Sequence, residues 1–168
     1  MFQSLEKRDF RLYWFGAIIS LTGSWIQIIA QGWLVYSLTK SEFLLGFIGF
    51  VSTLPVLFLS LPGGVIADQR DKRKLLLFTQ TTLMLLALAL GFLTAAGIVK
   101  IWHLLIIAIL TGAAMSLDGP VRQSLVLELV GAENLLNAIG LNSAAFNTAR
   151  IIGPALAGII IGSMGIAA

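Results

Sequence analysis

Residues 75–99 read LLLFTQTTLMLLALALGFLTAAGIV and contain no Asp, Glu, Lys or Arg. At 1.5 Å per residue, a helix of this length is about 37 Å long and exceeds the roughly 30 Å hydrocarbon core of a bilayer. The run does not alternate between polar and apolar residues, as a strand of a membrane barrel would. The stretch therefore predicts a tilted membrane-spanning helix.

Four further runs have the same character, and Arg150 is their one charged residue: 13–38, 43–67, 101–117 and 141–166. All eight acidic residues and ten of the eleven Lys and Arg residues lie outside the five runs. Charged residues make up 11% of the chain, whereas a soluble domain carries about 25%. We predict an all-α fold, a polytopic helical membrane protein with five transmembrane helices.

The Lys and Arg residues outside the runs are divided unequally between the two sides of the membrane. Eight lie on the side of the N-terminus, and only Lys40 and Lys100 lie on the other. Because cytoplasmic loops carry the excess of positive residues, we expect the N-terminus in the cytoplasm. The net charge of +3 is too dispersed among the connectors for a nucleic-acid site.

The connector after the fourth run contains a turn signal. Asp118-Gly119-Pro120 ends the apolar run, and residues 121–130 mix Leu and Val with Arg122 and Glu128. This pattern predicts a cytoplasmic amphipathic helix over 121–130 that lies along the membrane, followed by a turn at 131–134.

One polar stripe follows the first span. Ser20, Ser24, Gln27 and Gln31 are spaced 4, 3 and 4 residues apart, which places them on one face of a helix. Amides are costly in lipid unless they are paired. The stripe therefore faces either a neighbouring helix or a water-filled cavity.

The fifth span repeats this spacing with Ser143, Asn147, Arg150 and Pro154. Arg at the centre of a span costs about 2.5–3.5 kcal/mol on the insertion scale. Pro154 also removes the hydrogen bond to the carbonyl of Arg150, so the helix can bend there. Arg150 either pairs with a carbonyl or an acid for packing alone, or it has a functional role. We expect its side chain to face the interior of the bundle, towards the stripe of the first span.

Small residues suggest where helices approach closely. Ala149, Gly153 and Ala157 form a small-xxx-small ladder beside Arg150, with Gly158 on a neighbouring face. The second span offers a comparable face, and it also contains Pro55 and Pro62. The residues of that face are Gly46, Gly49, Thr53, Ser60 and Gly64.

The connector between the second and third spans carries a dense charge cluster. Gly64 lies one helical turn before Asp68, and Arg70, Lys72, Arg73 and Lys74 follow within six residues. Such a cluster can form and break salt bridges as helices move, or it can act only as a positive anchor at the membrane.

The pattern Gly-x-x-x-Asp-x-x-x-basic-basic in this connector resembles the signature loop of the major facilitator superfamily of secondary transporters. Other motifs resemble the branch of the superfamily that exports drugs and siderophores: Phe10-Arg11-Leu12-Tyr13-Trp14, Leu54-Pro55, Gly63-Gly64, Asp118-Gly119-Pro120-x-Arg122 and Gly153-Pro154-x-x-Ala157-Gly158. The resemblance implies twelve spans in two halves, of which residues 1–168 would form an N-terminal half-domain one helix short of six. It also implies that Gly153, Pro154, Ala157 and Gly158 bend and pack the fifth span.

The resemblance further implies a cytoplasmic charge relay, in which Asp68, Lys72 or Arg73, and Asp118 form one cluster. Gly64 and Arg122 belong to the motifs of the same relay. The leading hypothesis is then a fragment of a proton-coupled antiporter that exports amphipathic small molecules. Its substrate cavity would be lined by Ser24, Gln27, Gln31, Asn147 and Arg150 and completed by a missing C-terminal half or a second transmembrane chain.

Two other classes of protein were weighed. An integral membrane enzyme is disfavoured because His103, the only histidine, stands beside Trp102 at the membrane edge, where it acts more often as an anchor. A non-transporting membrane subunit, or a half-transporter that acts only as an oligomer, stays open as the alternative. With no Cys, thiolate metal sites are excluded, and no metal or cofactor is expected.

Overall fold

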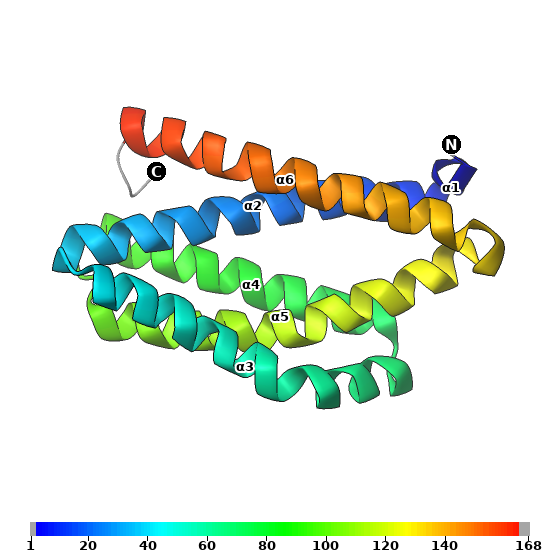
Figure 1. Cartoon of the computed structure of the whole chain (residues 1–168), viewed down its shortest axis with the longest axis horizontal. Helices are drawn as coiled ribbons and strands as arrows, with labels where there is room; N and C mark the ends of the chain where they lie inside the picture. Colours follow the sequence, from blue (N-terminus) through cyan, green and yellow to red (C-terminus); the bar gives the residue numbers. More distant parts are fainter. Residues whose placement is uncertain (1–2, 165–168) are drawn as a thin grey trace.

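The computed structural model describes residues 3–164, which form helices joined by short turns (Figure 1). Five of the described helices, α2 to α6, are long and apolar enough to cross a membrane, which confirms the predicted all-α polytopic fold. In chain order the elements are α1 (Gln3–Glu6), α2 (Arg8–Thr39), α3 (Glu42–Gln69), α4 (Lys72–Ala95), α5 (Ile101–Val130), the 3₁₀ helix η1 (Ala132–Asn134) and α6 (Leu135–Met164).

The turns between the helices follow from local chemistry. Lys40 adopts a left-handed conformation with φ 52° at the end of α2, and the Ser41 hydroxyl then accepts a hydrogen bond from the Leu44 amide to start α3. Asp71 starts α4 in the same way, because its carboxylate accepts hydrogen bonds from the amides of Arg73 and Lys74. Because these turns are short, α3 runs antiparallel to α2, and α4 runs antiparallel to α3.

Helix α5 corrects the predicted break after the fourth span. The span over 101–117 and the predicted separate helix over 121–130 form one continuous helix, Ile101–Val130, that contains Pro120. A proline removes only one backbone hydrogen bond, and the side chains of Asp118 and Arg122 pair across it at 2.6 Å. The helix ends instead at Gly131, whose φ of 74° suits glycine.

Helix α6 begins at Leu135, six residues before the predicted start of the fifth span. The connector before it is therefore shorter than predicted and consists of Gly131 and η1. The last two residues of the predicted span, 165 and 166, lie outside the described residues.

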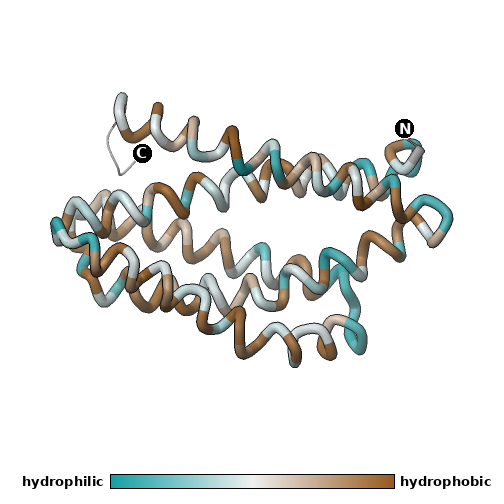
Figure 2. Tube along the Cα trace, viewed as in Figure 1, coloured by the Kyte–Doolittle hydropathy of each residue, from teal (hydrophilic) through white to brown (hydrophobic). Residues whose placement is uncertain are grey.

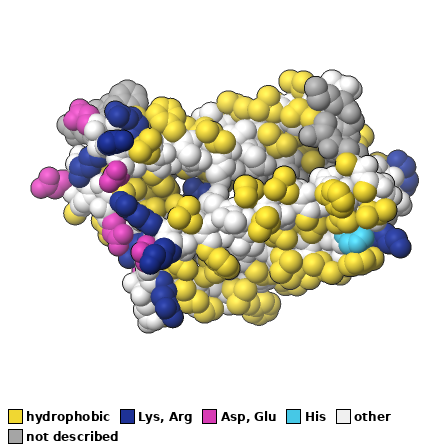
Figure 3. Space-filling model, turned by 180° about the vertical axis from the view of Figure 1, so that it is seen from behind, with side chains coloured by type: hydrophobic (Ala, Val, Ile, Leu, Met, Phe, Trp, Pro, Cys, Tyr) yellow, Lys and Arg dark blue, Asp and Glu magenta, His cyan; other side chains and the backbone are white. Residues whose placement is uncertain are grey.

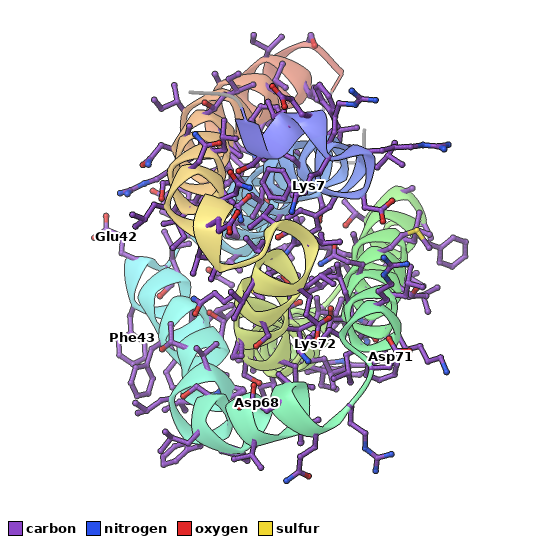
Figure 4. The ribbon with its side chains drawn as sticks, turned by 90° about the vertical axis from the view of Figure 1, so that its right-hand side faces the viewer. Lys7, Glu42, Phe43, Asp68, Asp71 and Lys72 are labelled. Atoms are coloured by element: carbon purple, nitrogen blue, oxygen red, sulfur yellow. The ribbon has the colours of Figure 1, made fainter. Side chains whose placement is uncertain are left out.

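The helices pack in two groups, which the end view in Figure 4 separates. In one group α3 and α4 pack on α5, and in the other α2 packs on α6; α2 also touches α3 and α5. The α3–α5 contact depends on glycine, because a Cβ on Gly63 would lie 2.9 Å from the carbonyl oxygen of Ser116. A Cβ on Gly112 would likewise collide with the carbonyl oxygen of Ser52.

The prediction for the second span is therefore wrong about which face of the helix packs against its neighbour. Gly46, Gly49 and Gly64 each have nothing within 4 Å of the position of a Cβ, so they face open space. The residues that turn towards α5 instead include Gly63 and Ala67, both buried. The sequence contains small residues on two faces of α3, and spacing alone does not distinguish between those faces.

The α2–α6 contact uses the ladder of small residues on α6. Ala149, Gly153 and Ala157 are buried, and a Cβ on Gly153 would lie 2.5 Å from the Cβ of Trp25 and 3.1 Å from the carbonyl oxygen of Thr22. Gly158, by contrast, has open space beside it. The ladder thus brings the two backbones together, while the neighbouring glycine face stays free.

The N-terminal segment fastens this pair of helices at one end. The Ser4 amide donates to Asn137 Oδ1 at 3.2 Å, and Lys7 Nζ donates to the carbonyl oxygen of Val130 at 2.6 Å. Phe10 is fully buried in an apolar cluster whose other members are Val126, Val130, Ala138 and Leu141. The segment from Ser4 to Phe10 is therefore part of the packed bundle.

The outer surface is mostly apolar along the length of the bundle, and most of the charged side chains lie at its ends; Arg150, half-way along α6, is exposed between them. The hydropathy tube shows apolar residues along the helices and hydrophilic ones at the turns (Figure 2). In the space-filling view, acidic and basic side chains gather at the end that carries the N-terminus and the α3–α4 turn (Figure 3). Exposed large apolar residues such as Phe58 and Leu61 suit contact with hydrocarbon. The chain is an integral membrane protein.

Candidate functional site

A buried ion pair lies on α5, at the centre of a polar network. Arg122 Nε donates to Asp118 Oδ2 at 2.6 Å, and the two side chains are only 15% and 13% exposed. The other carboxylate oxygen, Asp118 Oδ1, accepts from Thr79 Oγ1 at 2.7 Å and from Gln80 Nε2 at 2.6 Å. The carboxylate thus has three donors from two helices, as a buried charge requires.

The network continues to α2. The Ser20 hydroxyl donates to Gln80 Oε1, and Arg122 Nη2 donates to the Ser20 oxygen at 3.3 Å. The phenol of Tyr13, on the same helix, interacts with the Arg122 guanidinium. Asp118 and Arg122 therefore link α2, α4 and α5, across the boundary between the two groups of helices.

Sequence analysis identified Asp118 and Arg122 as candidate residues but missed their partners on α4. Thr79 and Gln80 lie inside the apolar run over 75–99. An amide within a span is a signal in itself, because it needs a partner in the bundle. The same reasoning that was applied to Gln27 and Gln31 would have found Gln80.

The predicted single cytoplasmic cluster of Asp68, Lys72 or Arg73, and Asp118 is not formed. Asp68 Oδ1 accepts a long hydrogen bond of 3.5 Å from Ser124 Oγ. Lys72 pairs with Glu128 at 2.6 Å, and Arg73 pairs with Asp9 at 3.5 Å. These are separate pairs, each to a different element.

The continuity of α5 explains this difference. Ser124 lies six residues beyond Asp118 on one helix, which is about 9 Å along its axis. The end of α3 and the start of α4 therefore meet the last turns of α5, while Asp118 lies deeper in the bundle. Gly64, the first residue of the predicted relay motif, contacts none of these charges directly, since it has no side chain and faces open space.

The polar stripe on α2 is used in two ways. Gln31 Nε2 donates to the carbonyl oxygen of Leu104 on α5 at 3.2 Å, which is a bond between helices. Ser24 Oγ donates to the carbonyl oxygen of Ser20 on its own helix at 3.1 Å. Within residues 3–164, Gln27 Nε2 is buried without a hydrogen-bond partner, as is Thr111 Oγ1 on α5. The stripe thus leaves an unsatisfied polar position in the middle of the bundle.

The placement predicted for Arg150 is corrected by the structure. Arg150 is exposed, and no ion pair to it is found among residues 3–164. The physical reason is the ladder on α6: Ala149 and Gly153 occupy the face towards α2, and Arg150 follows Ala149 by 100° around the helix. Asn147 is exposed as well, and its Nδ2 donates to the carbonyl oxygen of Ser143. The role predicted for both residues in a substrate cavity stays a prediction.

The described residues contain no group of three or more His, Asp or Glu side chains that could hold a metal ion. His103 Nδ1 accepts a hydrogen bond from the Lys100 amide at 3.0 Å, so this imidazole takes part in capping α5.

Apolar spans around a buried polar network define a polytopic helical membrane protein of the kind that moves solutes. Over residues 1–168 the chain matches the family described as transmembrane secretion effector, and it belongs to this family of major facilitator transporters. Membership of a transporter family points away from an enzyme. No solved structure matches the chain.

Three curated relatives are similar to the chain. It is 30% identical to the staphyloferrin A transporter of Staphylococcus aureus over 152 residues, which cover 90% of this chain and 38% of the relative. It is 26% identical to the multidrug efflux pump Tap of Mycolicibacterium fortuitum, over 90% of this chain and 38% of that pump. It is 25% identical to the uncharacterized MFS-type transporter YfiS of Bacillus subtilis, over 88% of this chain and 34% of that transporter. The chain therefore spans about a third of the length of these relatives.

Proposed function

We propose that this chain forms part of an exporter of amphipathic small molecules that works by proton-coupled alternating access in the plasma membrane, with its N-terminus in the cytoplasm. The observation that carries the proposal is the Asp118–Arg122 network, which joins three helices of a chain that belongs to a transporter family. The name of one relative, a multidrug efflux pump, supports export as the direction, and that of another, the staphyloferrin A transporter, supports a small-molecule substrate.

In this proposal the network holds one conformation of the bundle. Its contacts bridge the group formed by α2 and α6 and the group formed by α3, α4 and α5. A relative shift of the two groups would break the hydrogen bonds that cross between them, which include those of Ser20 with Gln80 and Arg122 and that of Gln31 with the carbonyl oxygen of Leu104. The exposed pair of Arg73 with Asp9 would then adjust with little energetic cost, because exposed pairs are worth about 0–1 kcal/mol.

The substrate cavity would lie against the exposed polar row of α6. Asn147 and Arg150 stand on this row. The opposite wall would come from a further part of the transporter, either a C-terminal half or a second transmembrane chain. A cavity between two such parts, open alternately to each side, is the arrangement typical of these folds.

A half-transporter that acts as an oligomer is a second candidate. The free glycine faces of α3 and α6 favour it, because Gly46, Gly49 and Gly158 have open space beside them. Small residues at such positions allow the helices of a second copy to approach closely.

The proposal is tested in cells that lack their own drug exporters and express the complete gene that encodes this chain. Intracellular accumulation of ethidium, an amphipathic cation, and of staphyloferrin A is measured with and without a protonophore. We expect lower accumulation of at least one compound, restored by the protonophore and by Arg150→Gln. Lys100→Gln, which removes an exposed cation in the turn before α5, is the matched control and should leave export intact. Accumulation equal to that of empty cells for both compounds would contradict the proposal.

A further inference from the structure

A shallow groove of about 500 Å³ lies where α3 ends and α4 begins. It opens at the end of the bundle where the charged side chains gather (Figure 3), beside the turn that carries Asp71 (Figure 4). Its lining residues come from the last turns of α3 and the first turns of α4: Ile66, Arg70, Asp71, Lys74, Leu75 and Phe78.

The charged part of the groove carries an excess of positive charge. Arg70 has no ion pair within residues 3–164, and Lys74 is 85% exposed with its Nζ 3.9 Å from Asp71 Oδ2. Asp71 is already engaged, because its Oδ1 accepts from the backbone amides of Arg73 and Lys74. Two cations and one acid leave the groove with a net charge of +1. The backbone amides of Arg73 and Lys74 already donate to Asp71, so they are not available to bind an anion.

The other part of the groove is apolar and faces outwards. Phe78 is 63% exposed and Ile66 is 42% exposed, and both join the apolar surface that runs along the bundle. An inorganic anion would gain nothing from these side chains. A phospholipid presents both an anionic headgroup and acyl chains at this depth of the membrane, and basic pockets between helices on the cytoplasmic side suit such lipids.

We propose that this groove binds an anionic phospholipid, with the headgroup phosphate between Arg70 and Lys74 and the acyl chains against Ile66 and Phe78. The site is independent of the proposed transport function. Lipid bound there ties the end of α3 to the start of α4, next to the Asp68–Ser124 and Lys72–Glu128 contacts with α5.

A second groove at the same end of the bundle lacks this excess of positive charge. It is lined by Leu12, Leu76, Leu125 and other residues of α2, α4 and α5, and its cation is Arg73. Arg73 pairs with Asp9 at 3.5 Å, and Asp9 also lines that groove. The charges of the second groove therefore cancel, and it offers an anionic headgroup no excess of positive charge.

The test compares lipid binding to the purified chain by native mass spectrometry in detergent. Dioleoylphosphatidylglycerol is titrated against dioleoylphosphatidylcholine, which has the same acyl chains and no net charge. The double variant Arg70→Gln/Lys74→Gln removes the two groove cations, and Lys40→Gln/Lys100→Gln removes two cations at the opposite end. All four side chains lie at the surface or its edge, so both variants should fold, and circular dichroism checks this.

We expect the unaltered chain to prefer phosphatidylglycerol and the groove variant to bind it about 25-fold more weakly, since each of the two cations near a membrane surface contributes about fivefold. The control variant should retain the preference. Phe78→Ala should weaken binding of the dioleoyl lipid, and glycerol phosphate should not displace it. Equal loss in both double variants, no preference between the two lipids, or displacement by glycerol phosphate would overturn the proposal.

Discussion

Removing the charge of Asp118 should destabilise the bundle more than removing any surface charge. Asp118→Asn keeps the shape of the side chain but leaves the Arg122 guanidinium, whose side chain is 15% exposed, without its counter-ion. Breaking a buried ion pair by neutralising one partner costs about 3–5 kcal/mol. Because an asparagine oxygen can still accept from Thr79 or Gln80, we expect the lower end, about 3 kcal/mol.

The free energy of unfolding is measured in detergent micelles by steric trapping, which needs no denaturant. Asp9→Asn is the matched control: it breaks the Asp9–Arg73 pair, whose side chains are 68% and 69% exposed, and should cost less than about 1 kcal/mol. The double variant Asp118→Asn/Arg122→Gln should recover most of the loss, because no unpaired charge is left buried. A cost for Asp118→Asn no larger than that of Asp9→Asn, or a double variant as unstable as the single one, would refute the reasoning.

Three further predictions follow from particular contacts. Gly153→Val should cost about 1–3 kcal/mol by forcing α6 away from Trp25, whereas Gly158→Ala should be nearly neutral; the same unfolding measurement checks both, and equal effects would contradict the packing. Gln80→Leu should cost about 1–3 kcal/mol by leaving Ser20 and Asp118 each short of a partner, whereas Thr82→Val, whose hydroxyl bonds only its own helix, should cost less. Because the chain has no Cys, single cysteines can report topology: an impermeant thiol reagent on intact cells should label Ser41→Cys and leave Gln69→Cys unlabelled, and the reverse result would invert the proposed orientation.

The five spans could be predicted from the sequence because long uncharged runs have few alternatives. Whether the helix continues through Pro120 could not be predicted in the same way. A turn signal is local, while the Asp118–Arg122 pair and the contacts with α4 that keep α5 helical depend on the folded bundle. The contacts of Asp68 with Ser124 and of Lys72 with Glu128 likewise depend on how the continuous helix α5 packs against α3 and α4, which a local pattern does not show.

The candidate site was predicted in part. Asp118, Arg122 and Gln31 each bond to another helix of the bundle, while their roles in a relay or a substrate cavity stay predictions. The predicted orientation of Arg150 is wrong, although the ladder of Ala149 and Gly153 can be seen in the sequence. Only one face of α6 can lie against α2, and small residues allow the closer approach, so the ladder excludes Arg150 from that contact.

The most direct test of the proposed function uses inside-out membrane vesicles from cells that express the complete gene. Ethidium uptake is followed after the vesicle interior is acidified relative to the medium. The account predicts uptake that stops when a protonophore collapses the gradient and that is strongly reduced by Arg150→Gln but not by Lys100→Gln. Uptake that is indifferent to the proton gradient would contradict the coupling, and uptake indifferent to Arg150 would contradict the site.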